Sequence, residues 1–174
     1  MRNYSLVVLV FIVICFVLSP VNLRAEEQLS ISQVSEKIHS PKDLSKFLKK
    51  NFKFVNDDKQ FGQIDYWQTP EEFLKNRKGD CEDYALFSKT ILQSLGYEAF
   101  VVSFYGANGF AHTVTVFGKD GKYSVMNEDR LKNYEASNIE IALSKIFRDW
   151  TWGSIARQEG TRGWSIRMLT NPAF

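Results

Sequence analysis

The sequence predicts an α+β fold in which helices precede an antiparallel sheet, and three observations support this class. Between residues 40 and 96, helix start signals are followed by apolar residues at helical spacing. From Tyr97 onward the apolar period changes to two, and glycine-containing turns separate short runs of β-branched and aromatic residues. Strands and helices do not alternate along the chain, so nothing in the pattern suggests a parallel sheet.

Two short helices are predicted at the start of this region. Ser40 and Thr69 are each followed by a proline, the arrangement of an N-cap with proline at the first helical position. Glu72 lies three residues after Thr69 and completes a capping box. The segment between them, residues 51–66, has no clean period and is expected to be a loop.

A longer helix is predicted to begin after Asp80 and to end at Gly96, which suits the position after a helix terminus. Its apolar residues recur at helical spacing, which indicates one buried face. That face is predicted to consist of Tyr84, Ala85, Ser88, Ile91, Leu92 and Leu95.

The second half of the chain is predicted to be mainly strand. A tight turn at 118–121 should pair the strand before it with the strand after it as a hairpin. Ser137 is expected to cap one further helix. The predicted strands cover 97–105, 110–117, 122–126, 151–156 and 164–168, and the helix covers 139–147.

The N-terminus has the layout of a secretory signal. Arg2 is followed by an uncharged apolar run over 6–18, and a small residue, Ala25, precedes two acids. The run is short for a membrane span, although a retained anchor is the alternative. We therefore expect a signal peptide over 1–25 and one domain over 26–174, for which the 44% hydrophobic content is ample.

The charge balance of the exported domain argues against a nucleic-acid partner. Removing residues 1–25 takes away Arg2 and Arg24 but no acid, which leaves 20 basic and 20 acidic residues. A nucleic-acid surface needs a clustered basic excess. We expect a periplasmic or secreted domain that has no stable membrane association after signal cleavage.

Cys81 is the one cysteine that the predicted exported domain retains, because Cys15 lies in the predicted signal. An exported chain with one thiol cannot form an internal disulfide, so the thiol is either buried and inert or kept for reactivity. Cys81 lies at the start of the predicted long helix, where unpaired N–H groups and the helix dipole favour a thiolate. This position predicts a nucleophile.

A cysteine nucleophile needs a base and a third group that orients the base. His39 precedes a helix and is expected to be solvated, whereas His112 shares one strand face with apolar residues. Counting from the hairpin turn places residues 126–129 beside His112, so Asn127 or Asp129 would orient the imidazole. The simpler alternatives are a core histidine and a turn asparagine. A zinc site is disfavoured, since no further Cys or His completes the shell.

Four motifs stand out in the chain: Asp65 to Glu72, Gly79-Asp80-Cys81-Glu82-Asp83-Tyr84-Ala85, Ala111-His112-Thr113-Val114 and Tyr123-Ser124-Val125-Met126-Asn127. Together they resemble the transglutaminase-like superfamily of papain-type enzymes, and most of all the bacterial transglutaminase-like cysteine proteinases. The resemblance covers about residues 65–127. It implies a papain-like fold, with the nucleophile-bearing helix packed on an antiparallel sheet, and a catalytic triad in which Asn127 replaces the usual aspartate.

The acids beside the cysteine conflict with a thiolate. Asp80, Glu82 and Asp83 would raise the thiol pKa, although acids in a first turn also complement the helix dipole. The resemblance implies that Asp80 and Glu82 bind calcium, as in some bacterial relatives. The chemistry itself requires no other cofactor.

The expected function is hydrolysis of an amide bond in a protein or peptide substrate through an acyl-thioester on Cys81. The oxyanion would be stabilised by the Cys81 backbone N–H and a second donor, for which Gln68, Trp67 and Gln63 are the candidates. Two alternatives remain at this point. One is amine transfer to protein glutamine, which cross-links proteins, and the other is a binding or assembly domain without turnover.

Overall fold

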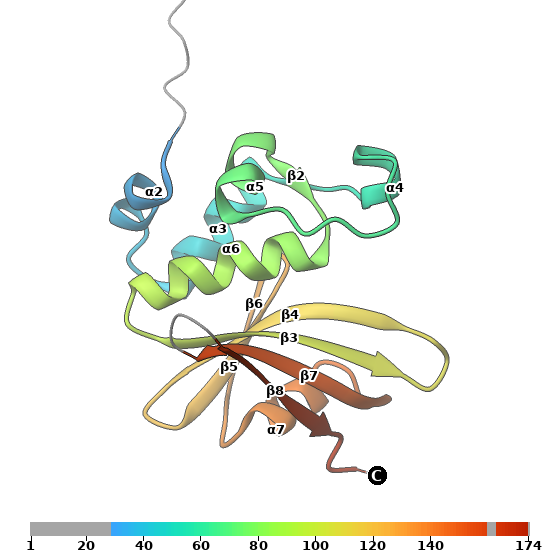
Figure 1. Cartoon of the computed structure of the whole chain (residues 1–174). Helices are drawn as coiled ribbons and strands as arrows, with labels where there is room; N and C mark the ends of the chain where they lie inside the picture. The colour runs from blue at the N-terminus through green and yellow to red at the C-terminus, as the bar shows by residue number, and fades with distance from the viewer. Residues whose placement is uncertain (1–28, 160–162, 174) are drawn as a thin grey trace, which may run out of the picture.

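The computed structural model describes residues 29–159 and 163–173, and in this part of the chain an antiparallel sheet lies between two helical layers (Figure 1). The strand order is β6-β5-β4-β3-β7-β8. The predicted signal over 1–25 lies outside the described residues. The strands are β3 (Glu98–Gly106), β4 (Ala111–Lys119), β5 (Lys122–Asn127), β6 (Arg130–Ala136), β7 (Trp150–Glu159) and β8 (Gly163–Thr170).

The N-terminal helices gather on one side of the sheet, and α7 lies on the other (Figure 1). A short parallel pair, β1 with β2, joins the segment before α4 to the segment before α6. No described helix has both the length and the apolar character needed to cross a membrane. The remaining elements are α2 (Ile31–Lys37), α3 (Pro41–Asn51), β1 (Lys53–Phe54), α4 (Asp57–Gln60), α5 (Pro70–Asn76), β2 (Lys78–Gly79), α6 (Cys81–Ser94) and α7 (Ile139–Ser144).

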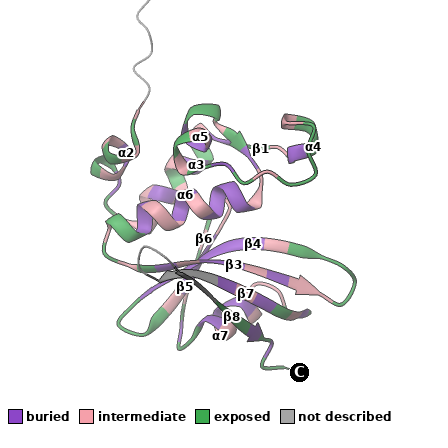
Figure 2. Cartoon of the chain, viewed as in Figure 1, coloured by how far each residue is buried: buried purple, intermediate pink, exposed green. Residues whose placement is uncertain are grey.

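Helix α6 is the central element of the helical layer, and its predicted buried face is largely confirmed (Figure 2). Leu95 is an exception, since it lies beyond the helix end and is half-buried. Phe87, which was not predicted, is fully buried against the rings of Phe52 and Phe73. A hydrogen bond of 2.7 Å from the Thr115 hydroxyl to the Ala85 carbonyl fixes α6 on β4. These contacts hold the start of α6 at a defined position over the sheet.

The opposite face of the sheet packs on α7 and forms a second apolar cluster. Strand β4 is therefore buried on both faces from Thr113 to Gly118, with Thr113 and Thr115 as its buried polar residues. The cluster on the α7 side includes Val102, Phe104, Val114, Val116, Val125, Leu143 and Trp150.

The α+β class is confirmed, but several local expectations were incomplete. Strand β6 was not predicted, because its mostly exposed residues do not alternate in hydrophobicity. Helices α2 and α4 were also missed, and α4 lies in the segment that was expected to be loop. Asn138, rather than Ser137, caps α7, since its side-chain oxygen accepts from the Ile141 N–H at 2.8 Å.

Candidate active site

Cys81 is the first residue of α6, and its thiol lies against strand β4. The backbone N–H of Thr113, the residue that follows His112, lies close enough to the Cys81 sulfur to lower the pKa of the thiol. The thiol is half-buried. The packing of α6 on the sheet therefore places the predicted nucleophile beside the strand that carries the predicted base.

His112 and Asn127 are joined by a hydrogen bond of 2.8 Å between Nε2 and Oδ1. Strands β4 and β5 pair from the hairpin turn as far as Thr115 and Met126, and beyond that point the two side chains lie on the same sheet face. Because Oδ1 is an acceptor, Nε2 carries the proton, and Nδ1 is left as the basic nitrogen.

The alternative orienting residue, Asp129, has other partners. Its carboxylate lies 3.8 Å from the guanidinium of Arg130, and its backbone carbonyl accepts from the Ser45 hydroxyl at 2.6 Å. The geometry therefore places Asn127 at the imidazole. The catalytic roles of Cys81, His112 and Asn127 remain predictions.

Aromatic side chains surround the His112 imidazole. The rings of Phe104 and Phe147 contact it edge-on, with centroids 5.7 and 5.5 Å from the imidazole centroid, and Phe110 lies 6.0 Å away. This agrees with the prediction that His112 shares an apolar strand face. The ring contacts restrict the orientation of the imidazole in addition to the hydrogen bond that His112 donates to Asn127.

The Cys81 thiol does not meet the expectation that a helix N-terminus would favour the thiolate. Its S–H donates to Glu82 Oε2 at 3.1 Å. Burial raises the pKa of Cys81 to about 12, with further contributions from the Glu82 hydrogen bond and charge, whereas the Thr113 N–H acts in the opposite direction. As long as no cation neutralises the neighbouring carboxylates, the Cys81 thiol keeps its proton.

The acidic cluster is larger than the sequence suggested. Asp57 and Asp65 join the three acids next to Cys81. The ligand atoms of Asp57, Asp80 and Asp83 lie within 4.8 Å of one another, and those of Asp57, Asp65 and Glu82 form a second such group. The missed signal was the Asp57-Asp58 pair in a segment that was expected to be an irregular loop.

Two oxygens of this cluster are buried without a hydrogen-bond partner among the described residues. They are Asp57 Oδ1 and Asp80 Oδ1, and the Asp57 side chain is only 1% exposed. The other Asp57 oxygen accepts from the Tyr66 N–H. A buried carboxylate oxygen that lacks a hydrogen bond and lies among other carboxylates destabilises the folded state, and a bound hard cation offsets that cost in free energy. The donor set, which is all oxygen apart from the thiol, fits calcium.

The pKa values of Glu82 and Asp83 are raised, which also indicates that no positive charge balances these carboxylates in the described structure. Burial, followed by the hydrogen bond with Asp80, raises the pKa of Glu82 to about 8. Burial also raises the pKa of Asp83 to about 6, against the opposing hydrogen bonds from Gln68 and Asp80.

The metal-free protein should lose stability as pH rises from 4.5, the ordinary pKa of Glu82, to about 8. A carboxyl group with a raised folded-state pKa contributes stability below its unfolded pKa, and that contribution is lost as pH rises through the folded value. Melting temperatures measured in chelator across this range test the expectation, and Glu82→Gln should flatten the decline. A melting temperature that rises through the same range in chelator would contradict it.

Gln68 joins residues 65–69, which lead into α5 and are called the lead-in segment, to the start of α6. Its Nε2 donates to Asp83 Oδ2 at 2.6 Å and to the Lys78 carbonyl at 2.9 Å, and its backbone N–H donates to Asp83 Oδ1 at 2.8 Å. Both side-chain N–H bonds are therefore engaged, and the geometry does not support the oxyanion role predicted for Gln68. Gly79 is required here, because a Cβ at this position would lie 2.1 Å from Asp83 Oδ2.

The other two oxyanion candidates are exposed. Trp67 is 45% exposed, and its indole N–H lies 3.2 Å from Asp65 Oδ1. Gln63 is exposed in the turn after α4. Neither side chain forms a hydrogen bond with Cys81 in the structure, and the Cys81 backbone N–H remains the predicted oxyanion donor.

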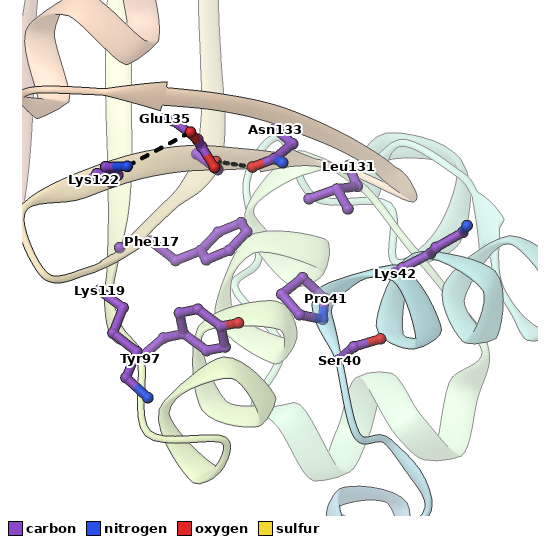
Figure 3. Close-up of a pocket in the computed structure, with 12 residues that line it drawn as sticks. Ser40, Pro41, Lys42, Tyr97, Phe117, Lys119, Lys122, Leu131, Asn133 and Glu135 are labelled. Atoms are coloured by element: carbon purple, nitrogen blue, oxygen red, sulfur yellow. Dashed lines mark hydrogen bonds and ion pairs between the residues drawn. The ribbon is translucent and has the colours of Figure 1, made fainter.

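A cavity of about 470 Å³ lies away from this site, beyond the C-terminal end of α6 (Figure 3). Tyr97 and Phe117 form its apolar floor, and Lys42, Lys119 and Lys122 stand at its edge. Neither Cys81 nor His112 lines it.

Comparisons with known proteins identify the family. A family model described as a transglutaminase-like domain matches residues 24–142, and the chain belongs to this family. The expected family resemblance is therefore confirmed. None of the curated proteins compared with the sequence matches it significantly.

Among solved structures, EGTA-treated LapG from Legionella pneumophila is 14% identical over 78% of this chain and 87% of its own, with a TM-score of 0.45. Calcium-bound LapG is 15% identical over 77% and 84%, with a TM-score of 0.44. A candidate cysteine protease from Cytophaga hutchinsonii is 11% identical over 80% of this chain and 50% of its own, with a TM-score of 0.46.

Proposed function

We propose that this protein is an exported cysteine peptidase that hydrolyses an amide bond of a protein or peptide substrate. The observation that carries the proposal is the hydrogen bond between His112 and Asn127, on a strand whose next residue, Thr113, contacts the Cys81 thiol. Nucleophile, base and orienting group therefore come from α6, β4 and β5, which are packed directly against one another.

The chemistry is acyl transfer in two steps. The Cys81 thiol gives its proton to His112 Nδ1, and the sulfur attacks the carbonyl carbon to form a tetrahedral oxyanion near the Cys81 backbone N–H. The C–N bond breaks, and the amine leaves with the proton from His112. Water, deprotonated by His112, then attacks the thioester, and the acid product and the free thiol are released.

The acidic cluster is proposed to hold calcium through Asp57, Asp65, Asp80 and Glu82. When bound, calcium would supply positive charge that neutralises these carboxylates. Glu82 would then no longer be the acceptor that holds the thiol proton. The thiol pKa should fall as a result, so that transfer of the proton to His112 becomes easier.

Export is part of the proposal and rests on the N-terminal pattern alone. Residues 1–25 would be removed as a signal, and the domain would act in the periplasm or outside the cell, without stable membrane association and without a nucleic-acid partner. N-terminal sequencing of the protein recovered after export tests this part.

Cleavage of a defined peptide library tests the enzymatic part. The wild-type protein with calcium should generate new amino termini, and Cys81→Ala should generate none. Ammonia release that depends on added amine, without new amino termini, would instead indicate protein cross-linking. The absence of both activities would indicate a binding domain.

Asn127→Ala should lower turnover by roughly ten- to a thousandfold with little loss of stability, because the imidazole loses the acceptor that fixes its tautomer. Asp129→Ala is the matched control, since its carboxylate lies by Arg130 rather than His112. Peptide hydrolysis and melting temperature should be measured for both variants. A larger loss of turnover in Asp129→Ala than in Asn127→Ala would assign the orienting role to Asp129.

A further inference from the structure

A second cavity, of about 370 Å³, lies next to His112, where the turn between β3 and β4 meets the segment between α7 and β7. We call it the aromatic pocket. Its apolar walls are Phe110, Ile146, Phe147 and Trp150.

The aromatic pocket and the predicted catalytic base share two walls. Phe110 and Phe147 both line the pocket, and both contact the His112 ring, with centroid distances of 6.0 and 5.5 Å. The two phenylalanine rings also lie 5.7 Å from each other. A group bound in the pocket would therefore lie one side chain away from the imidazole.

The lining indicates an uncharged, apolar occupant. Phe110 is 43% exposed although it belongs to the pocket wall, so part of its apolar surface is free for contact. Arg148 and Asp149, both exposed, carry opposite charges at the pocket. This pair gives no net preference for an anion or a cation, and burial of apolar surface is left as the main source of affinity.

We propose that the aromatic pocket binds a large apolar side chain of the polypeptide substrate and thereby selects the amide bond presented to Cys81 and His112. This inference rests on the proposed peptidase function. Phe110 is the wall residue with the most exposed ring, and it is the specificity-determining position to test.

Three peptidyl chloromethyl ketones test the pocket: acetyl-Gly-Gly, acetyl-Phe-Gly and acetyl-Gly-Phe. In each case the Cys81 sulfur forms a bond to the methylene carbon, the C–Cl bond breaks, and chloride and the thiol proton leave. At least one phenylalanine probe should inactivate the calcium-loaded wild-type protein about tenfold faster than the Gly-Gly probe.

Phe110→Ala should remove most of this advantage, whereas Phe54→Ala should retain it. Phe54 is a matched control, because it is 49% exposed and lies on β1, outside the pocket. Iodoacetamide, which has no side chain to fill the pocket, reports the reactivity of Cys81 separately in each variant.

Equal inactivation rates for all three probes, with normal iodoacetamide labelling, would overturn the proposal that the aromatic pocket selects the substrate. The peptidase proposal would still stand. A phenylalanine preference that persists in Phe110→Ala would also overturn it. If iodoacetamide fails to label Cys81 in the wild-type protein, the proposed function fails, and this inference fails with it.

Discussion

Replacing His112 with alanine should slow amide hydrolysis by about a thousandfold. The imidazole has to accept the thiol proton before attack and to protonate the leaving amine afterwards, so its loss affects both steps. The side chain is half-buried, and its ring contacts with Phe104 and Phe147 are lost in the variant. A modest loss of stability is therefore expected, far short of unfolding.

His39→Ala is the matched control for this prediction, because the chain contains only two histidines and His39 is exposed between α2 and α3. Initial rates on a cleaved peptide, together with melting temperatures, should be measured for both variants. A folded His112→Ala protein with wild-type rates would rule out His112 as the base.

Chelation of calcium should reduce activity and thermal stability together. A ligand that binds only the folded state stabilises it by about 2.7 kcal/mol at a hundred times its dissociation constant. The activity should fall because the thiol then donates to the Glu82 carboxylate and keeps its proton. Melting temperature and peptide hydrolysis, each measured in excess calcium and in EGTA, test both expectations.

Asp57→Asn should weaken the calcium response, and Asp58→Asn is its matched control. Asp57 is buried, and one of its oxygens has no hydrogen-bond partner in the described part of the chain, whereas Asp58 is exposed on the same helix. Cys81→Ser should keep the stabilisation by calcium, since the thiol is not needed to bind a hard cation. Calorimetry that shows no heat on calcium addition, with equal melting temperatures in EGTA, would leave the acids without a metal.

The elements that the sequence predicted well are those controlled by local rules. Thr69 and Glu72 form the expected capping box, and the tight turn after β4 fixed the strand pairing that brings Asn127 to His112. Side-chain alternation then places both residues on one face. Cap chemistry and hairpin register need only nearby residues, so they can be recognised without the fold.

The features that the sequence did not predict depend on contacts between distant segments. The amide of Gln68 is occupied by Asp83 and by the carbonyl of Lys78, and neither partner could be recognised before the lead-in segment was placed on α6. Asp57 joins the acidic cluster for the same reason, since it precedes Asp80 by a loop, a helix and a strand. Strand β6 was missed because an exposed edge strand carries little hydrophobic alternation.

The most direct test of the central claim, that His112 activates Cys81, is the rate of Cys81 alkylation by iodoacetamide as a function of pH in excess calcium. The wild-type thiol should titrate well below pH 8.5, the usual value for a free cysteine, and His112→Ala should shift the profile upward while His39→Ala leaves it unchanged. In EGTA the wild-type profile should move toward the pKa of about 12 that burial, together with the uncompensated charge of Glu82, imposes on the thiol. Identical profiles for the wild-type protein and His112→Ala would contradict the account.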